Sequence, residues 1–386
     1  MPQQLKLSQI SQVKEWEQRR QQAVQFYKQS QFREYLALSE LNLQLAREIQ
    51  DQDREATALN EIGLAHIRLW QPQQAIQVFC EALEFQREIG DVRGEASTLN
   101  NMGSAYGQLG QPQKSLELFQ QALTILQKLQ DRWVEAVTLN SMALAYIRLS
   151  QPKQALLLCN QVLPIRQELG DRVGESATLN NMGLIYCDLG QLPAALNCFQ
   201  RALVIQQELG DRLGEATALN NISSIYSDMG EPKRAILLYH QILLIRRELR
   251  DRYGEATILN NIGYAYADIK QYEEALDYYY QALDIRKDLG DRAGEATTLN
   301  NIGFIHRDRR QFKQALEFYH HALHIQKTLG DRAGEIATLS NLGSVWEKLG
   351  QPDWAHAFYT DAQQLAQHLD NPTLLEWVQR LLDDLK

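Results

Sequence analysis

The chain has 386 residues, of which 44% are hydrophobic and 23% are charged, so its composition excludes a disordered polyelectrolyte and allows a sizeable core. Its formal net charge of −9 disfavours nucleic acid and anionic lipid as partners, because both attract basic surfaces. The four cysteines form no CxxC pair, and no apolar run reaches the length of a membrane span. A disulfide framework, a zinc ribbon and direct membrane insertion are therefore not expected.

The first 50 residues are the least regular part of the chain. The opening segment, MPQQLKLSQI, lacks the apolar core of a signal peptide. We therefore expect a cytoplasmic location, or a periplasmic one if a signal peptide has been removed. Residues 11–50 match the later repeats only loosely, with Tyr35 in a column of small residues. We predict that residues 1–50 form a degenerate repeat that caps the amino-terminal end.

A segment close to DRxGEATxLNNIG recurs every 40 residues along the rest of the chain. It begins at Asp51, Asp91, Asp131, Asp171, Asp211, Asp251, Asp291 and Asp331. A period without insertions indicates units that each pack only on their neighbours, as in a solenoid. We predict eight regular units over residues 51–370, and a capping helix over residues 371–386 whose apolar side chains share one face.

Each unit is predicted to be a helix–turn–helix pair, which makes the fold class all-α. In one unit, Ala256, Leu259, Ile262 and Gly263 follow helical spacing, and a second helical set follows a short turn. At the junction between units, glycine ends one helix and the aspartate of the DRxGE segment caps the next. One unit carries Pro164 inside its second helix, which predicts either a hinge or a tolerated local defect.

The combined pattern, L-x-x-[IM]-G-x-x-Y followed by A-x-x-x-[FY]-x-x-A, resembles the tetratricopeptide repeat (TPR) over roughly residues 11–370. The 40-residue unit is similar to the long-repeat subclass of Pins/LGN-type adaptors and bacterial TPR arrays. The resemblance implies a right-handed α-solenoid of nine units, whose first helices line a concave groove. It also implies a protein-interaction scaffold or adaptor that binds an extended peptide or partner segment in that groove.

Asparagines around the LNN segment are the first group of candidate peptide-binding residues. The complete pairs are Asn180 with Asn181, Asn220 with Asn221, Asn260 with Asn261, and Asn300 with Asn301. A primary amide offers donors and an acceptor, so a row of asparagines can hold an extended peptide backbone. The alternative is that one asparagine of each pair only bridges neighbouring helices, because buried polar groups need partners in either case.

Carboxylates and aromatic rings are the second group of candidates. An aspartate lies seven residues, or two helical turns, beyond each complete pair, at Asp188, Asp228, Asp268 and Asp308. Tyr264 and Phe304 lie three residues beyond their pairs and are predicted to form an aromatic wall. This combination favours a basic, extended peptide. The alternative is an acidic face that only meets solvent.

A metal-handling protein is the alternative function. The nine-unit count is also similar to the cyanobacterial processing-associated TPR proteins (PratA-like), which implies photosystem assembly with a partner protein and Mn²⁺. His320 and His324 have the spacing of residues that can share a metal, and Asp361 is the third weak candidate ligand. No catalytic or cofactor motif is recognised, so we predict a non-enzymatic protein without a cofactor.

Overall fold

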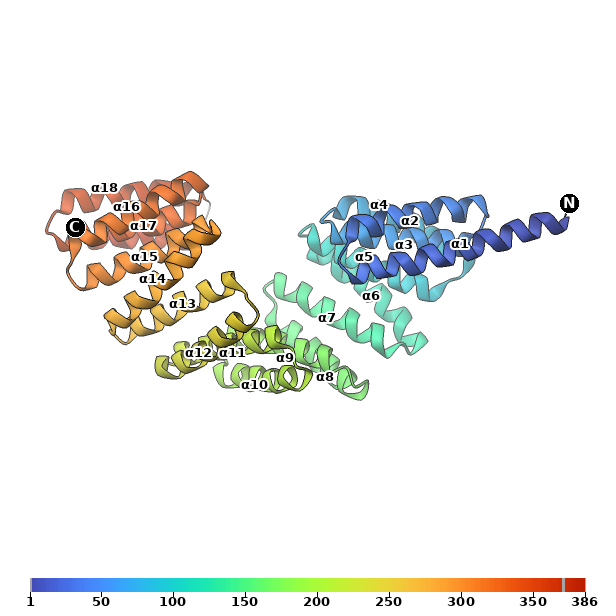
Figure 1. Ribbon diagram of the computed structural model, residues 1–386, viewed down its shortest axis with the longest axis horizontal. Coiled ribbons are helices and arrows are strands. Elements are labelled where there is room, and N and C mark those ends of the chain that lie inside the picture. Colours follow the sequence, from blue (N-terminus) through green and yellow to red (C-terminus); the bar gives the residue numbers. More distant parts are fainter. Residues whose placement is uncertain (1, 370–371, 386) are drawn as a thin grey trace. The chain divides into compact units, whose positions relative to one another are not determined.

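The computed structural model describes residues 2–369 and 372–385, and these form helices joined by short turns (Figure 1). The helices are α1 (Pro2–Lys28), α2 (Phe32–Glu48), α3 (Gln52–Arg68), α4 (Pro72–Ile89), α5 (Val92–Gln108), α6 (Pro112–Leu129), α7 (Arg132–Arg148), α8 (Pro152–Glu168), α9 (Arg172–Asp188), α10 (Leu192–Leu209), α11 (Arg212–Asp228), α12 (Pro232–Glu248), α13 (Arg252–Asp268), α14 (Tyr272–Leu289), α15 (Arg292–Asp308), α16 (Phe312–Leu329), α17 (Arg332–Lys348), α18 (Pro352–His368) and α19 (Pro372–Asp384).

The chain divides into two compact units, residues 1–205 and residues 206–386. Within each unit, a helix packs on the helix before it and on the helix after it. The first helices of successive repeats also contact each other, α3 with α5 and α5 with α7 in unit 1, and α13 with α15 and α15 with α17 in unit 2. The predicted α-solenoid is confirmed.

Aspartate caps define where the first helix of each repeat begins. The side chain of Asp251, for example, accepts a hydrogen bond of 2.8 Å from the backbone N–H of Gly254. The same cap recurs at Asp51, Asp91, Asp131, Asp171, Asp211, Asp291 and Asp331. It satisfies one of the N–H groups that every helix start leaves without a partner.

The glutamate of the DRxGE segment ties consecutive repeats together. Glu255 is buried and accepts hydrogen bonds from Arg252 in its own helix (2.9 Å) and from Arg247 at the end of the preceding helix (2.7 Å). Because the two guanidinium groups come from either side of the turn, the pair of bonds links the end of one repeat to the start of the next. The DRxGE segment thus has a structural role at the junction between repeats.

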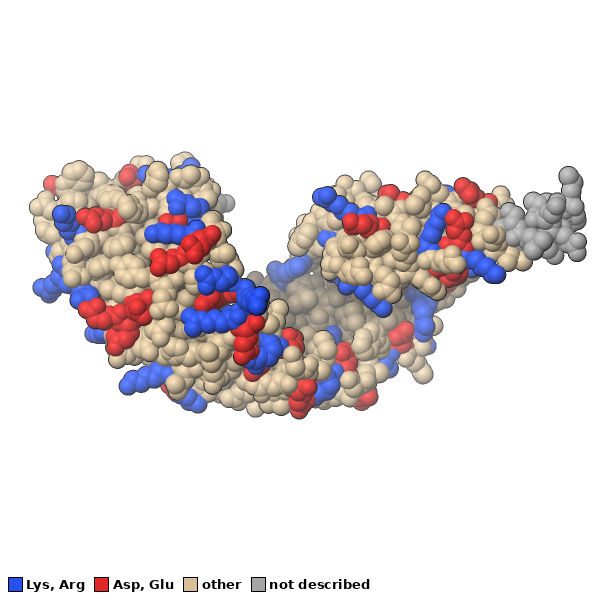
Figure 2. All heavy atoms as spheres, in the orientation of Figure 1, with Lys and Arg blue, Asp and Glu red and all other residues tan. Residues whose placement is uncertain are grey.

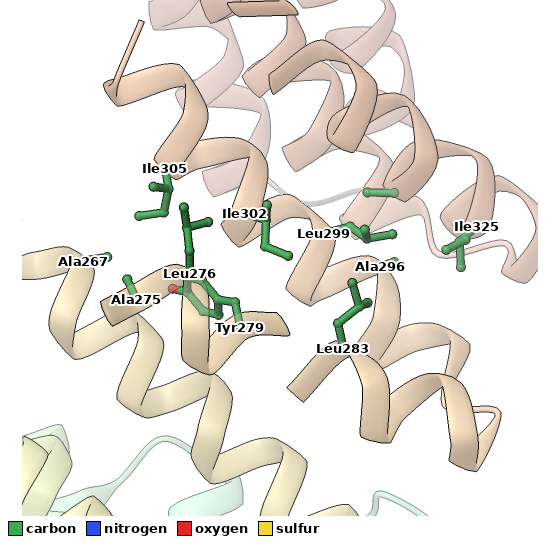
Figure 3. Close-up of a cluster of buried hydrophobic side chains, with 11 residues drawn as sticks. Ala267, Ala275, Leu276, Tyr279, Leu283, Ala296, Leu299, Ile302, Ile305 and Ile325 are labelled. Atoms are coloured by element: carbon green, nitrogen blue, oxygen red, sulfur yellow. The ribbon is translucent and has the colours of Figure 1, made fainter. Parts of the chain in front are cut away.

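Small residues and aromatic rings meet inside each helix pair. A Cβ placed on Gly263 would lie 2.8 Å from the ring of Tyr279, so only glycine allows this approach of α13 and α14. Tyr279 is 1% exposed and packs in an apolar cluster with Leu276, Leu299 and other side chains from α13 to α16 (Figure 3). The cluster continues from one repeat into the next, which is how a repeat that has too little core of its own is stabilised.

The two ends of the chain differ from the regular repeats. In the first repeat, Trp16 is buried and its indole N–H donates to the carbonyl oxygen of Asn42 (3.1 Å). At the other end, α19 packs on α18 and buries Val378 and Leu382. Residues 370, 371 and 386 of the predicted final segments lie outside the described residues. Among the described helices, none combines the length and the apolar character that crossing a bilayer requires.

Candidate peptide-binding surface

The asparagine pairs lie where the first helices of adjacent repeats touch. Every member of the predicted pairs is half-buried: Asn180 and Asn181 on α9, Asn220 and Asn221 on α11, Asn260 and Asn261 on α13, and Asn300 and Asn301 on α15. The α9 pair belongs to unit 1 and the other three pairs belong to unit 2.

Several of these amides form hydrogen bonds between repeats. The side-chain N–H of Asn301 donates to the side-chain oxygen of Asn260 (3.1 Å), and Asn181 donates in the same way to Asn140 (3.2 Å). Asn101 and Asn60 repeat the arrangement at 3.0 Å. At these three junctions, the second asparagine position of one repeat therefore bridges to the first asparagine of the repeat before it. Each bond leaves the donating amide with a further N–H and its oxygen, so bridging does not exhaust the asparagines.

Six of the predicted residues come together in one pocket of unit 2. The pocket has a volume of about 330 Å³ and lies at the surface of α13 and α15. The predicted residues that line it are Tyr264, Asp268, Asn300, Asn301, Phe304 and Asp308. Tyr264 is 63% exposed and Phe304 is 39% exposed, so both rings are available to a ligand. Asn220, Asn221, Asn260, Asn261 and Asp228 are also in unit 2 but are not part of this lining.

The pocket also contains residues beyond the candidate peptide-binding residues given above. Tyr272, Tyr279 and Lys270 come from α14 and from the turn before it, and Asn341 comes from α17. Asn341 occupies the same repeat position as Asn301, so the 40-residue period could have added it. The contribution of α14 depends on how the two helices of a repeat pack, which the period does not specify.

The two carboxylates of the pocket differ in their surroundings. Asp308 forms an ion pair with Arg307 (3.1 Å), and the Arg307 guanidinium also lies 4.4 Å from the centre of the Phe304 ring. Asp268, in contrast, forms no ion pair with any residue that the structure describes. Burial and the nearby Asp308 carboxylate raise the pKa of Tyr272 above its usual value. Asp268 is thus the carboxylate whose charge is most available to a ligand.

The aspartate column has an unfavourable position in its helices. Asp188, Asp228, Asp268 and Asp308 are the last residues of α9, α11, α13 and α15, and all four are exposed. A helix C-terminus carries partial negative charge, so a carboxylate there is destabilising by about 0.3–1 kcal/mol. Helix stability therefore does not explain why aspartate occurs at these four positions.

The weak metal candidates do not form a binding site among the described residues. His320 and His324 are on α16 and Asp361 is on α18. His320 contacts the ring of Phe358 (6.5 Å between centroids), and burial, followed by His321 and Lys327, lowers its pKa. Within residues 2–369 and 372–385, no three His, Cys, Asp or Glu side chains are grouped so that they could hold a metal ion. The metal-handling alternative thus gains no support.

An α-solenoid with a row of polar side chains along its first helices defines a repeat protein that serves as a protein-interaction scaffold. The sequence matches the tetratricopeptide repeat family over residues 94–168, 174–248, 238–288 and 294–368. The chain therefore belongs to the tetratricopeptide repeat family, as the repeat pattern predicted.

Solved structures of other proteins have a similar fold. The apo form of RapI is 15% identical, with a TM-score of 0.69 over 92% of this chain and 98% of RapI. The apo form of the quorum sensor NprR from B. thuringiensis is 15% identical, with a TM-score of 0.60 over 94% of this chain and 99% of NprR. A Rap protein complexed with competence and sporulation factor is 14% identical, with a TM-score of 0.51 over 96% of this chain and 97% of that protein. A comparison with curated proteins gives no match.

Proposed function

We propose that the chain is a non-enzymatic scaffold that holds an extended, basic segment of a partner protein, with the unit 2 pocket as its anchor point. The observation that carries the proposal is the meeting of two exposed aromatic rings, Tyr264 and Phe304, with the unpaired carboxylate of Asp268 in one hollow.

The chemistry of this pocket suits a lysine or arginine side chain. The face of an aromatic ring attracts a cation, and a carboxylate at the same site adds a charge-assisted hydrogen bond. Arg307 already lies over the Phe304 ring and beside Asp308, which is the same combination made within the chain. A volume of about 330 Å³ is at the lower end of ligand sites, so it suits one long side chain better than a larger molecule.

The asparagines next to the pocket would bind the backbone of the same segment. Asn300 and Asn301 line the pocket, and Asn301 keeps a further N–H and its oxygen beyond its bond to Asn260. Contacts to peptide N–H and C=O groups are independent of side chains, so the aromatic and acidic residues would supply the selectivity. The complex of a Rap protein with competence and sporulation factor supports the proposal only in showing that this fold can accommodate a ligand.

Binding of a basic peptide by single variants tests the proposal. The probe is a short fluorescein-labelled peptide in which lysine alternates with serine. Its binding is measured by fluorescence anisotropy. We expect Asp268→Asn to weaken binding about tenfold, which is the size of one charge-assisted hydrogen bond. Tyr264→Ala should also weaken binding. The affinity of the unchanged protein should fall with added salt, because the interaction is between charges.

Two matched variants serve as controls. Asp228→Asn removes the same charge at the same repeat position, outside the pocket. Tyr253→Ala removes a tyrosine of α13 that is 64% exposed, almost as Tyr264 is, but lies outside the pocket. Both controls should bind as the unchanged protein does. Equal losses in the control and the pocket variants, or no binding of the peptide at all, would contradict the proposal.

A further inference from the structure

Unit 1 has a pocket at the same repeat position as the unit 2 pocket, with the opposite charge. It has a volume of about 290 Å³ and is lined by residues of α3, α5, α6 and α7. Leu64, Arg68 and Asn101 line it, at positions 200 residues, or five repeats, before Tyr264, Asp268 and Asn301. The repeat therefore forms a pocket at this position in both units, and the side chains at its variable positions decide what enters.

Two guanidinium groups give the unit 1 pocket its charge. Arg68 occupies the repeat position of Asp268, and Arg148 on α7 occupies the repeat position of Asp308, so both aspartate positions of the unit 2 pocket are represented by arginine here. Its lining contains no aspartate or glutamate. Both arginines are the last residues of their helices, where a cation is favoured by the helix dipole. The helix dipole thus stabilises the two arginines at these C-termini, whereas it destabilises the aspartates at the C-termini of the unit 2 helices.

Neutral partners hold both arginines. Arg68 donates to the hydroxyl of Tyr27 (3.0 and 2.6 Å) and lies over the same ring at 5.5 Å. Arg148 donates to the carbonyl oxygen of Gly107. Neither forms an ion pair in the part of the chain that the structure describes, whereas Arg47 and Arg87 on the nearby second helices are paired with glutamates. Arg68 and Arg148 are therefore positioned, but their charges are not neutralised.

We infer that the unit 1 pocket binds an acidic segment of a partner protein, whose carboxylates pair with Arg68 and Arg148. A planar guanidinium with N–H groups to spare is the side chain best suited to a carboxylate. Leu64 and Leu144, which also line the pocket, would pack on the apolar parts of the segment. This goes beyond the proposed function, because it assigns a second ligand, of opposite charge, to the other unit of the chain.

The surroundings favour a peptide over nucleic acid. The chain carries a net charge of −9. On the face seen in Figure 2, Lys and Arg are interspersed with Asp and Glu, so the basic side chains of that face do not gather into one broad patch. Nucleic-acid binding rests on many phosphate contacts. Two arginines flanked by leucines offer few phosphate contacts, but they match a short run of acidic and apolar residues.

The test uses the full chain and a fluorescein-labelled peptide in which glutamate alternates with leucine. We expect this peptide to bind, and versions with glutamine or lysine in place of glutamate to bind at least about tenfold more weakly. Arg68→Gln with Arg148→Gln should weaken binding of the glutamate peptide to a similar degree. Arg68→Lys with Arg148→Lys should restore part of the affinity, because the charge returns without the planar donor group.

The control is Arg33→Gln with Arg201→Gln, which removes the same amount of charge from exposed positions of unit 1 outside the pocket. It should bind the glutamate peptide as the unchanged protein does, and Asp268→Asn should do so as well. Circular dichroism of each variant checks that the helices are retained. Three outcomes would overturn the inference: no binding of the glutamate peptide, the same loss in the control variant, or tighter binding of a single-stranded oligonucleotide than of the peptide.

Discussion

At the scale of single residues, asparagines at the same repeat position have different roles in different repeats. Asn301 bridges to Asn260 in the preceding repeat, and the hydroxyl of Thr298 adds a weak donor to the same oxygen (3.4 Å). Asn261 occupies the same repeat position as Asn301, but its side chain forms no hydrogen bond with any described residue. The identical sequence position therefore contributes to the stability of one repeat junction and leaves the amide free at another.

This difference predicts unequal effects of the same substitution. Asn301→Ala should lower the free energy of unfolding by about 1 kcal/mol, because it removes a part-buried hydrogen bond. Asn261→Ala should change stability by less than about 0.5 kcal/mol, because it removes no side-chain hydrogen bond to a described residue. Urea unfolding followed by circular dichroism measures both. Equal destabilisation by the two variants would show that the bond between repeats is not what Asn301 contributes.

At the scale of helices, the repeat tolerates local departures from good helix chemistry. Helix α8 continues from Pro152 to Glu168 although Pro164 lies inside it. Other helices end with a non-glycine residue in the left-handed region, such as Arg250 with φ of 54°. Both features cost free energy locally, and the packing of each helix on two neighbours offsets them. An unbroken α8 agrees with a tolerated defect at Pro164.

Replacing this proline should therefore stabilise the chain. Pro164 is exposed, so alanine creates no steric conflict, and Pro164→Ala restores a backbone N–H to the helix. We expect a gain approaching the roughly 3 kcal/mol that an interior proline costs, seen as a higher thermal midpoint by circular dichroism. Thr124→Ala, at the same repeat position in α6 and also exposed, should hardly move the midpoint. An unchanged midpoint in Pro164→Ala would mean that the proline conformation is not strained.

At the scale of the whole molecule, stability is distributed along the chain. Each helix contacts its neighbours in sequence, so the apolar clusters of one unit contain residues from only a few consecutive helices. A structure of this kind behaves as a row of coupled repeats and can lose order in one place while keeping it elsewhere.

A single overpacked position should show this local behaviour. In Gly263→Ala, the new Cβ would lie 2.8 Å from the Tyr279 ring and 3.1 Å from the backbone oxygen of Ala275, which cannot move aside easily. We expect a destabilisation of about 1–3 kcal/mol. Hydrogen exchange followed by mass spectrometry should show faster exchange in α13 and α14, with α3 to α6 unchanged. A uniform increase along the chain would indicate a single cooperative unit instead. Thr257→Ala, a half-buried change on α13 that leaves the contact of Gly263 with Tyr279 untouched, is the control.

The sequence by itself determined the family, the helix pairs and the caps, because the 40-residue period repeats each local signal. Asp251 and its equivalents could be identified as caps from their place after a helix end, and Gly263 as a close helix contact from its column. Six residues of the unit 2 pocket could also be selected, because one position on the repeat surface recurs in every unit. Period and local chemistry are properties of the chain that need no knowledge of distant contacts.

Only the tertiary structure decided which polar groups are already paired. It placed Arg307 on Phe304 and Asp308, tied Asn301 to Asn260, and left Asp268, Arg68 and Arg148 without an ion pair among the described residues. It also brought Tyr272 into a pocket that the column positions alone did not predict. The physical reason is that pairing depends on side-chain reach between helices of different repeats, and this follows from packing geometry, which a repeat position does not specify.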